Sequence, residues 1–117
     1  MQNGYIPRSM TERFSALQNR QREYLETRGW LGQTPKSVSM SIAIEAAELM
    51  EEFQWDGDNS ADRIRESDEH MDRIREEVAD VLIYCMNLEI ELDIDLLDAV
   101  EAKIEANERR DRPVKDV

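Results

Sequence analysis

The chain is predicted to be all-α, a four- to five-helix bundle protomer that assembles into an oligomer. Its 117 residues combine 40% hydrophobic and 36% charged residues with only 6% aromatics, four Gly and three Pro. That composition suits long amphipathic helices better than a β-sandwich. Apolar residues recur at helical intervals over long segments, and helix-capping residues separate these segments. The length fits a single domain over residues 1–117, in which residues 1–8 form an irregular tail.

Charge and composition exclude several classes of function. The formal net charge of -12 argues against a nucleic-acid partner, because a protein that binds a phosphate backbone needs a basic face. No apolar run approaches the roughly 20 residues that cross a bilayer, and no signal peptide is recognisable, so no membrane partner is expected. Cys85 is the single cysteine and cannot form an intramolecular disulfide. A reducing compartment, the cytoplasm, is therefore the expected location.

The first helix is expected to follow Ser9 and to end near Arg28 and Gly29. Ser9 and Glu12 form a capping-box pattern in which Ser9 is the N-cap. The side chains of its inner face then follow at helical intervals: Phe14, Leu17, Gln21, Tyr24 and Leu25. Gly29 ends the helix, since glycine is favoured just after the last helical residue.

The second helix is expected over residues 35–54. Thr34 supplies the N-cap, and Pro35 occupies the first helical position. Proline is tolerated there because its missing N–H would have had no partner within the helix. Residues 56–59 read as a turn, rich in Asp, Gly and Asn, that ends this part of the chain.

Ser60 is a plausible cap for the next segment, residues 61–75, in which charged residues dominate. That segment is either a solvent-facing helix or a partly ordered connector, and the sequence leaves both open. From Glu76 the residues are apolar on most of the helix circumference, which predicts a central helix. This helix should end near Leu92 and Asp93.

The last helix is expected to begin after Asp95. An aspartate is a good N-cap, and Asp98 in the first turn complements the helix dipole. The helix should run to about Arg109. Its apolar residues are expected to point inward: Leu96, Leu97, Val100 and Ile104.

Two carboxylate pairs lie in the two most apolar segments of the chain. Glu45 and Glu48 stand one helical turn apart, and Glu77 and Asp80 repeat that spacing in the central helix. An ionised carboxylate is almost never buried without a partner, because desolvating its charge is costly. Oxygen ligands without His or Cys select Mg²⁺ or Mn²⁺ over zinc. The pairs therefore predict a divalent-metal site, of the kind that clamps phosphoryl groups and activates water.

Simpler interpretations exist for individual residues. A lone Glu-x-x-Glu is most often a solvated surface pair, and the apolar surroundings of both pairs are what favour a metal site. A di-iron bundle would need Glu-x-x-His pairs, and the single histidine, His70, has Ser67 three residues before it. His70 is therefore expected on the solvated surface, and Cys85 as a small core residue without a chemical role.

The order and spacing of the motifs resemble a known family. The two carboxylate pairs are accompanied by Thr34-Pro35-Lys36-Ser37, Phe53-Gln54-Trp55, Asp80-Val81-Leu82-Ile83-Tyr84 and Lys103-x-x-x-Asn107-x-x-Arg110. Together they resemble the signature of the all-α nucleoside triphosphate pyrophosphohydrolases, the MazG-like proteins and their dCTP pyrophosphatase relatives. The resemblance extends over residues 30–114, nearly all of the chain.

The resemblance implies Mg²⁺-dependent hydrolysis of a (deoxy)nucleoside triphosphate between its α and β phosphates, to a nucleoside monophosphate and pyrophosphate. It implies a part in nucleotide pool sanitation, with dCTP as the first candidate. The chain departs from the dCTP-directed group near Gln33 and over residues 110–113, which leaves base preference open. The alternatives are a phosphoribosyl-ATP or dUTP pyrophosphohydrolase of the same superfamily, or a non-catalytic helical oligomerisation module.

The resemblance also implies roles for individual residues. The family's carboxylates at the positions of Glu45, Glu48, Glu77 and Asp80 hold Mg²⁺ and form the catalytic centre, and Mn²⁺ could substitute for it. Substrate contacts are expected from Trp30, Lys36, Trp55, Tyr84, Lys103, Asn107 and Arg110. The two tryptophans match positions that line the base pocket, and the last three residues form one helical stripe suited to phosphate and sugar contacts.

The apolar content of the second and central helices exceeds what a chain of this size can cover by itself. Family members also assemble as dimers or tetramers, often with sites completed by neighbouring chains. We therefore expect a homo-oligomer, with a tetramer favoured over a dimer.

Overall fold

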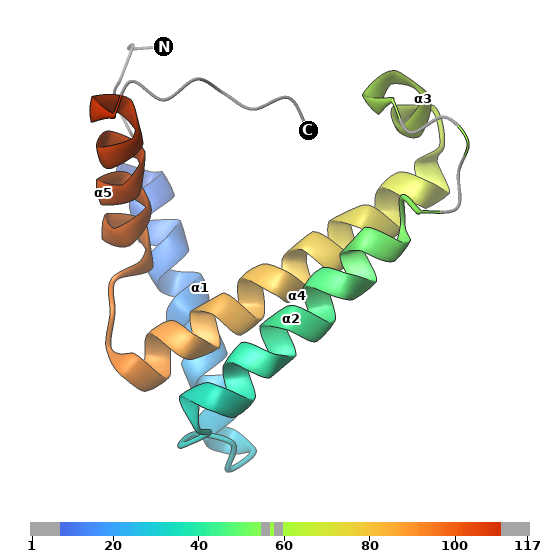
Figure 1. Cartoon of the computed structure of the whole chain (residues 1–117). Coiled ribbons are helices and arrows are strands. Elements are labelled where there is room, and N and C mark those ends of the chain that lie inside the picture. Colours follow the sequence, from blue (N-terminus) through green and yellow to red (C-terminus); the bar gives the residue numbers. More distant parts are fainter. Residues whose placement is uncertain (1–7, 55–56, 58–59, 111–117) are drawn as a thin grey trace.

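The computed structural model describes residues 8–54, 57 and 60–110, and these residues form helices and connecting turns without a strand. The helices are α1 (Arg8–Thr27), α2 (Pro35–Glu51), α3 (Ala61–Arg65), α4 (Asp68–Leu92) and α5 (Leu96–Arg109) (Figure 1). The prediction of an all-α protein is confirmed. No helix in the described part of the chain is long and apolar enough to cross a bilayer.

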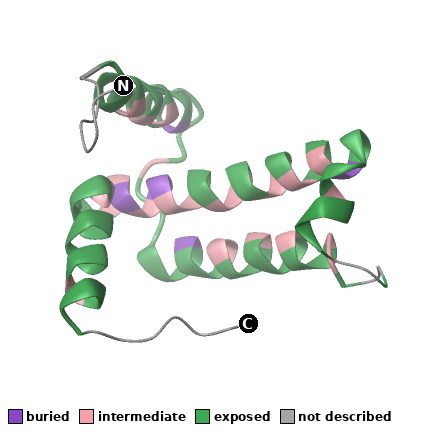
Figure 2. Ribbon diagram, turned by 90° about the horizontal axis from the view of Figure 1, so that it is seen from above, coloured by how far each residue is buried: buried purple, intermediate pink, exposed green. Residues whose placement is uncertain are grey.

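Helices α2 and α4 form the centre of the molecule. They run antiparallel and side by side, and α4 lies between α2 and α1 (Figures 1 and 2). Among the described residues, the buried apolar side chains are Val38 on α2, Met86 on α4 and Leu25 on α1. The short helix α3 lies between α2 and α4 in the chain and packs against α4 near the amino-terminal end of α4 (Figure 1). The prediction that the apolar run after Glu76 belongs to a central helix is therefore confirmed.

Short polar side chains set where the helices begin. The Thr34 side chain accepts a hydrogen bond from the backbone N–H of Ser37 at 3.2 Å, as predicted for an N-cap. Asp95 does the same for the N–H of Asp98 at 2.9 Å. Ser60 caps α3 in this way. These three predictions are confirmed because an N-cap depends only on residues next to one another in the chain.

Helix α2 ends at Glu51, close to the predicted Gln54 and within the boundary error of about 2–4 residues that such predictions carry. Two other predicted boundaries were wrong. Helix α1 already includes Ser9, so Ser9 is not its N-cap. The charged segment over residues 61–75 is neither one helix nor a connector, because Ser67 caps a new helix that begins at Asp68. Its second half is thus the first two turns of α4.

The apolar residues of α5 do not point into a core within this chain. Leu97, Val100 and Ile104 are 43%, 48% and 52% exposed, and only Leu96 is half-buried. The expectation that all four point inward was wrong for the single chain, because α5 packs closely on neither α2 nor α4. Helix α5 therefore leaves an apolar face half-exposed, where it lines a hollow with Met10 and Phe14 of α1.

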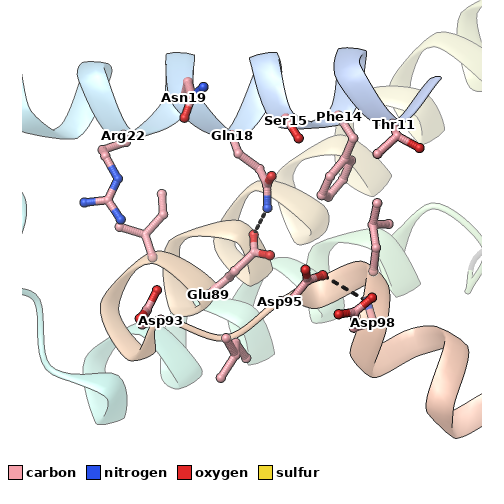
Figure 3. A pocket seen from close by; sticks show the side chains of 13 residues that line it. Thr11, Phe14, Ser15, Gln18, Asn19, Arg22, Glu89, Asp93, Asp95 and Asp98 are labelled. Atoms are coloured by element: carbon pink, nitrogen blue, oxygen red, sulfur yellow. Dashed lines mark hydrogen bonds between the residues drawn. The ribbon is translucent and has the colours of Figure 1, made fainter. Parts of the chain in front are cut away.

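Glu89 joins three helices at the carboxyl end of α4. Its side chain is buried, and its Oε2 accepts a hydrogen bond from the backbone N–H of Leu96 at 2.7 Å, at the start of α5. Its Oε1 accepts another from Gln18 on α1 (Figure 3). Beside it, Gln21 donates to Asn87 at 2.9 Å. Gln18 and Glu89 line a hollow of about 420 Å³ between α1, the end of α4 and the start of α5 (Figure 3).

Candidate metal centre

The α2–α4 pair brings three of the four predicted carboxylates together. Glu45 and Glu48 lie one turn apart on α2, and Glu77 lies on α4. Each offers one carboxylate oxygen such that all three oxygens lie within 4.8 Å of one another. Alanines at positions 46, 47 and 79 flank these residues, and their small side chains suit the close approach of two helices. The proximity of side chains 32 residues apart in sequence follows from the antiparallel packing of α2 and α4.

Asp80 stands beside this group and outside its closest set of oxygens. It is half-buried on α4, one turn after Glu77. Its charge contributes to the raised pKa of Glu45 and of Glu77, which shows that it acts on the same small volume. Glu45, Glu48, Glu77 and Asp80 are called the carboxylate cluster below.

The carboxylate cluster has no internal compensation for its charge. Burial, and then the negative charges of Glu48 and Asp80, raise the pKa of Glu45 above its ordinary value. Burial and the same two carboxylates raise the pKa of Glu77. Moreover, the Oε2 atom of Glu77 is buried and has no hydrogen-bond partner in the described part of the chain. A buried polar atom of that kind requires a partner such as an ion or water.

The donor set fits a hard divalent cation. All members of the carboxylate cluster offer oxygen, and neither His nor Cys belongs to the group. Mg²⁺ and Mn²⁺ prefer such ligands, whereas zinc prefers nitrogen and sulfur. The orphaned oxygen of Glu77 and the converging oxygens of Glu45 and Glu48 are the ligand atoms that such an ion would use.

A second group of side chains lies next to the carboxylate cluster, and the sequence did not point to it. Glu52 follows the last residue of α2, and its Oε1 accepts a hydrogen bond from Nε of Arg73 on α4 at 3.0 Å. The His70 Nε2–H donates to the backbone carbonyl of Glu52 at 2.7 Å and lies 3.6 Å from Oε1 of the same residue. The sequence did contain a signal for this group. Glu52 lies four residues after Glu48 and Arg73 four before Glu77, and residues four apart share one side of a helix.

His70 is buried, so its predicted place on the solvated surface was wrong. The ring lies under the end of α2, with its centroid 6.0 Å from that of Phe53. The charged sequence around it suggested exposure, but the same helix turn that exposes its neighbours directs His70 toward Glu52. Cys85, expected in the core, is half-buried on α4.

The predicted substrate-contact residues occupy different places. Tyr84 is half-buried on α4, one turn after Asp80 and on the same side of the helix. Lys36 is exposed in the first turn of α2, about 14 Å along the helix from Glu45. Trp30 is 48% exposed and packs edge-on against Tyr24, with a centroid separation of 6.0 Å. Trp55 lies outside the described residues.

The stripe of Lys103, Asn107 and Arg110 does not reach the carboxylate cluster within one chain. All three residues are exposed at or just after α5. Helix α5 does not pack on α2, and Figure 1 shows it beside α1, apart from the central pair. The sequence motifs predicted that this stripe and the carboxylates belong to one site, but within a single chain they lie apart.

Carboxylates gather between the antiparallel helices α2 and α4. The protein is therefore an all-α protein with an acidic site suited to a divalent cation. Comparison with known proteins gives the family. The model of the MazG-like family matches residues 40–116, and the chain belongs to this family. That match includes the whole carboxylate cluster and α5. The resemblance seen in the sequence is confirmed.

The individual proteins that are similar to this chain carry pyrophosphatase names. The chain is 33% identical over 76 residues to dCTP pyrophosphatase 1 of Bos taurus and 34% identical over 76 residues to dCTP pyrophosphatase 1 of Homo sapiens. Each match covers 65% of this chain and 45% of the relative, so the chain spans less than half the length of these curated relatives. A crystal structure of a pyrophosphatase from Archaeoglobus fulgidus DSM 4304 is 36% identical, with a TM-score of 0.75, over 97% of this chain and 99% of that one.

Proposed function

We propose that the protein is a Mg²⁺-dependent nucleoside triphosphate pyrophosphohydrolase, which cleaves its substrate between the α and β phosphates and releases pyrophosphate. The observation that carries this proposal is the approach of oxygens from Glu45, Glu48 and Glu77 to within 4.8 Å of one another. The relatives named dCTP pyrophosphatase and pyrophosphatase support the same activity. The hydrolysis would serve nucleotide pool sanitation in the cytoplasm.

The roles of the residues follow from their chemistry. Glu45, Glu48, Glu77 and Asp80 would hold Mg²⁺, or Mn²⁺ in its place. A bound ion of this kind neutralises phosphate oxygens and lowers the pKa of a coordinated water. A carboxylate of this cluster that is not fully engaged by the metal would accept the proton of the attacking water. The hydroxyl of Tyr84, on the same side of α4 as Asp80, would donate a hydrogen bond to a phosphate oxygen.

The substrate is proposed to be a (deoxy)nucleoside triphosphate, with dCTP first. The dCTP pyrophosphatase names of two relatives support this choice. Trp30 and Trp55 are proposed to stack on the base, since an exposed tryptophan such as Trp30 offers a large aromatic face. Lys36 is proposed to contribute a phosphate contact. Phosphoribosyl-ATP and dUTP remain the alternative substrates.

The active form is proposed to be a homo-oligomer, a tetramer or a dimer. The exposed apolar side chains of α5, together with Ile44 on α2 and Leu82 on α4, support this, because a monomer rarely leaves contiguous apolar surface uncovered. A neighbouring chain could then bring Lys103, Asn107 and Arg110 to the carboxylate cluster that they do not reach in their own chain.

The test is the release of pyrophosphate from a panel of nucleotides that includes dCTP, dUTP and phosphoribosyl-ATP, with Mg²⁺ and with a chelator. We expect turnover of at least one nucleotide, only with metal. Glu48→Gln should lower turnover by more than the ~10–100-fold typical of outer-sphere partners of a metal. Glu26→Gln, which changes an exposed carboxylate of α1, is the matched control. If no nucleotide is hydrolysed and Glu48→Gln leaves Mg²⁺ affinity unchanged, the chain is a non-catalytic helical module.

A further inference from the structure

Arg73 is a cation fixed at the edge of the carboxylate cluster, and no function assigned so far uses it. It lies on α4 one turn before Glu77, so the two side chains share a side of the helix at about 6 Å between Cβ atoms. Its Nε donates to Oε1 of Glu52 at 3.0 Å, while its side chain stays 56% exposed. Glu52 is itself only 16% exposed. A half-buried carboxylate thus holds an accessible guanidinium in one place.

The hydrogen bond to Glu52 engages one of the N–H donors of the Arg73 guanidinium. The group carries five N–H donors, and Nε supplies one. The donors of Nη1 and Nη2 have no partner among the described residues. They form the planar pair that binds two oxygens of a phosphate at once.

Arg73 is the basic residue of the central pair that lies one helical turn from a member of the cluster and on the same side of the helix. On α2 the only basic residue is Lys36, nine residues before Glu45. On α4 the other arginine is Arg75, whose Nη1 lies 2.9 Å from the Asp72 carboxylate and which is two-thirds exposed. The stripe on α5 is remote in the same chain. The cluster and a polyphosphate are both anionic, so a cation besides the metal is needed where they meet.

We propose that Arg73 is a substrate-binding residue that contacts the polyphosphate of the nucleotide, with Glu52 as the positioning residue that aims its guanidinium. This inference rests on the proposed function, because it concerns the substrate of that same site. The pair also ties the end of α2 to α4, and a purely structural role for it is the alternative that an experiment must separate.

The experiment measures binding of Mg²⁺ and of inorganic pyrophosphate with Mg²⁺ by calorimetry, and steady-state kinetics on the best nucleotide of the panel. Arg73→Gln should weaken pyrophosphate binding by about tenfold or more, since a charge-assisted contact to phosphate is lost. KM should rise by a similar factor, with Mg²⁺ affinity unchanged. Arg73→Lys should bind pyrophosphate with intermediate affinity, because it keeps the charge without the paired donors. Glu52→Gln should shift pyrophosphate affinity in the same direction by a smaller factor.

Arg75→Gln is the matched control, as an exposed arginine of the same helix, and should bind pyrophosphate like the wild type. The proposal is overturned if Arg73→Gln and Arg75→Gln bind pyrophosphate equally, or if Arg73→Gln lowers the melting temperature without altering pyrophosphate affinity. Should Arg73→Gln not fold, wild-type affinity in Arg73→Lys would overturn it as well. A wild-type protein that hydrolyses no nucleotide rejects the proposed function itself, whereas normal turnover with an unaffected Arg73→Gln rejects only the role of Arg73.

Discussion

Glu77 carries a carboxylate that is partly removed from water and surrounded by other negative charges. Its Oε2 is buried without a hydrogen-bond partner in the described residues, and its pKa is raised by burial and by the charges of Glu48 and Asp80. Like charges in a partly desolvated space repel one another, and removing their hydration adds to the cost. Metal binding and protonation are the two ways to relieve this cost, and they lead to separate predictions.

Without metal, the protein should lose stability as the pH rises. Glu45 and Glu77 have pKa values above the ordinary 4.5 in the folded state, so the folded chain binds their protons more tightly than the unfolded chain. The free energy of unfolding therefore falls as the pH rises from 4.5 through the raised values. We expect the melting temperature in a chelator to be lower at about pH 8 than at about pH 5.5. Because the net charge of -12 adds its own repulsion, the comparison is with Glu45→Gln/Glu77→Gln, in which this fall should be smaller. An equal fall in both proteins would contradict the prediction.

With metal, the trend should weaken or reverse. A ligand that binds only the folded state raises its stability by about 2.7 kcal/mol at a concentration of 100 Kd. Protons compete with the metal for carboxylates, so the gain should grow with pH. Thermal unfolding with and without Mg²⁺ should show a higher melting temperature for the wild type and for Glu26→Gln. Glu48→Gln should show little or no rise, and a rise equal to that of the wild type would exclude Glu48 as a ligand.

One helix end has an unfavourable backbone conformation. Helix α4 ends at Leu92, and Asp93 directly after it adopts a left-handed conformation, with φ of 54°. The backbone N–H of Asp93 bonds to the carbonyl of Glu89 there, which closes the helix. Glycine adopts this conformation without the steric cost that a Cβ imposes.

Asp93→Gly should therefore stabilise the protein, by less than the roughly 1–2 kcal/mol steric cost of the left-handed conformation, because glycine also gains entropy in the unfolded chain. Asp93→Ala should destabilise it, since alanine tolerates the left-handed region less well than aspartate. Chemical denaturation of both variants beside the wild type measures the two effects. If both variants shift the free energy of unfolding in the same direction, the backbone conformation is not the cause.

Across the molecule, burial is sparse for a chain of this length. Leu25, Val38 and Met86 are the buried apolar residues among those described, whereas large apolar side chains are exposed on every long helix. A face of α5 formed by Leu97, Val100 and Ile104 lines an open hollow with Met10 and Phe14 of α1, and its three side chains stay 43–52% exposed. Covering such faces between copies is what obligate homo-oligomers do.

We expect light scattering at micromolar concentration to show a tetramer or a dimer. Val100→Glu should shift the population toward smaller species, because it places a charge in the apolar face of α5. Ala102→Glu changes an exposed alanine on the opposite side of the same helix and should leave the assembly intact. A monomeric wild type would refute the oligomer, and equal effects of both variants would exclude this face as the interface.

The features that were predictable are those that depend on neighbours in the chain. Thr34, Ser60 and Asp95 act as N-caps because each meets a backbone N–H three residues further on. The carboxylate pairs were visible because charged residues stood in apolar helical segments, where their burial needs a reason. The helical periodicity gave the all-α class in the same way.

Other features depend on how the helices pack. Only the antiparallel packing of α2 and α4 reveals that Glu45, Glu48 and Glu77 converge while Asp80 stands beside them. It also buries His70 and pairs Arg73 with Glu52, although most residues around both in the sequence are charged. For α5, the helical periodicity correctly identified an apolar face. The expectation that this face points into a core of the same chain was wrong. Periodicity defines which side of a helix is apolar, but the covering partner is set by packing between elements that are distant in sequence or in another chain.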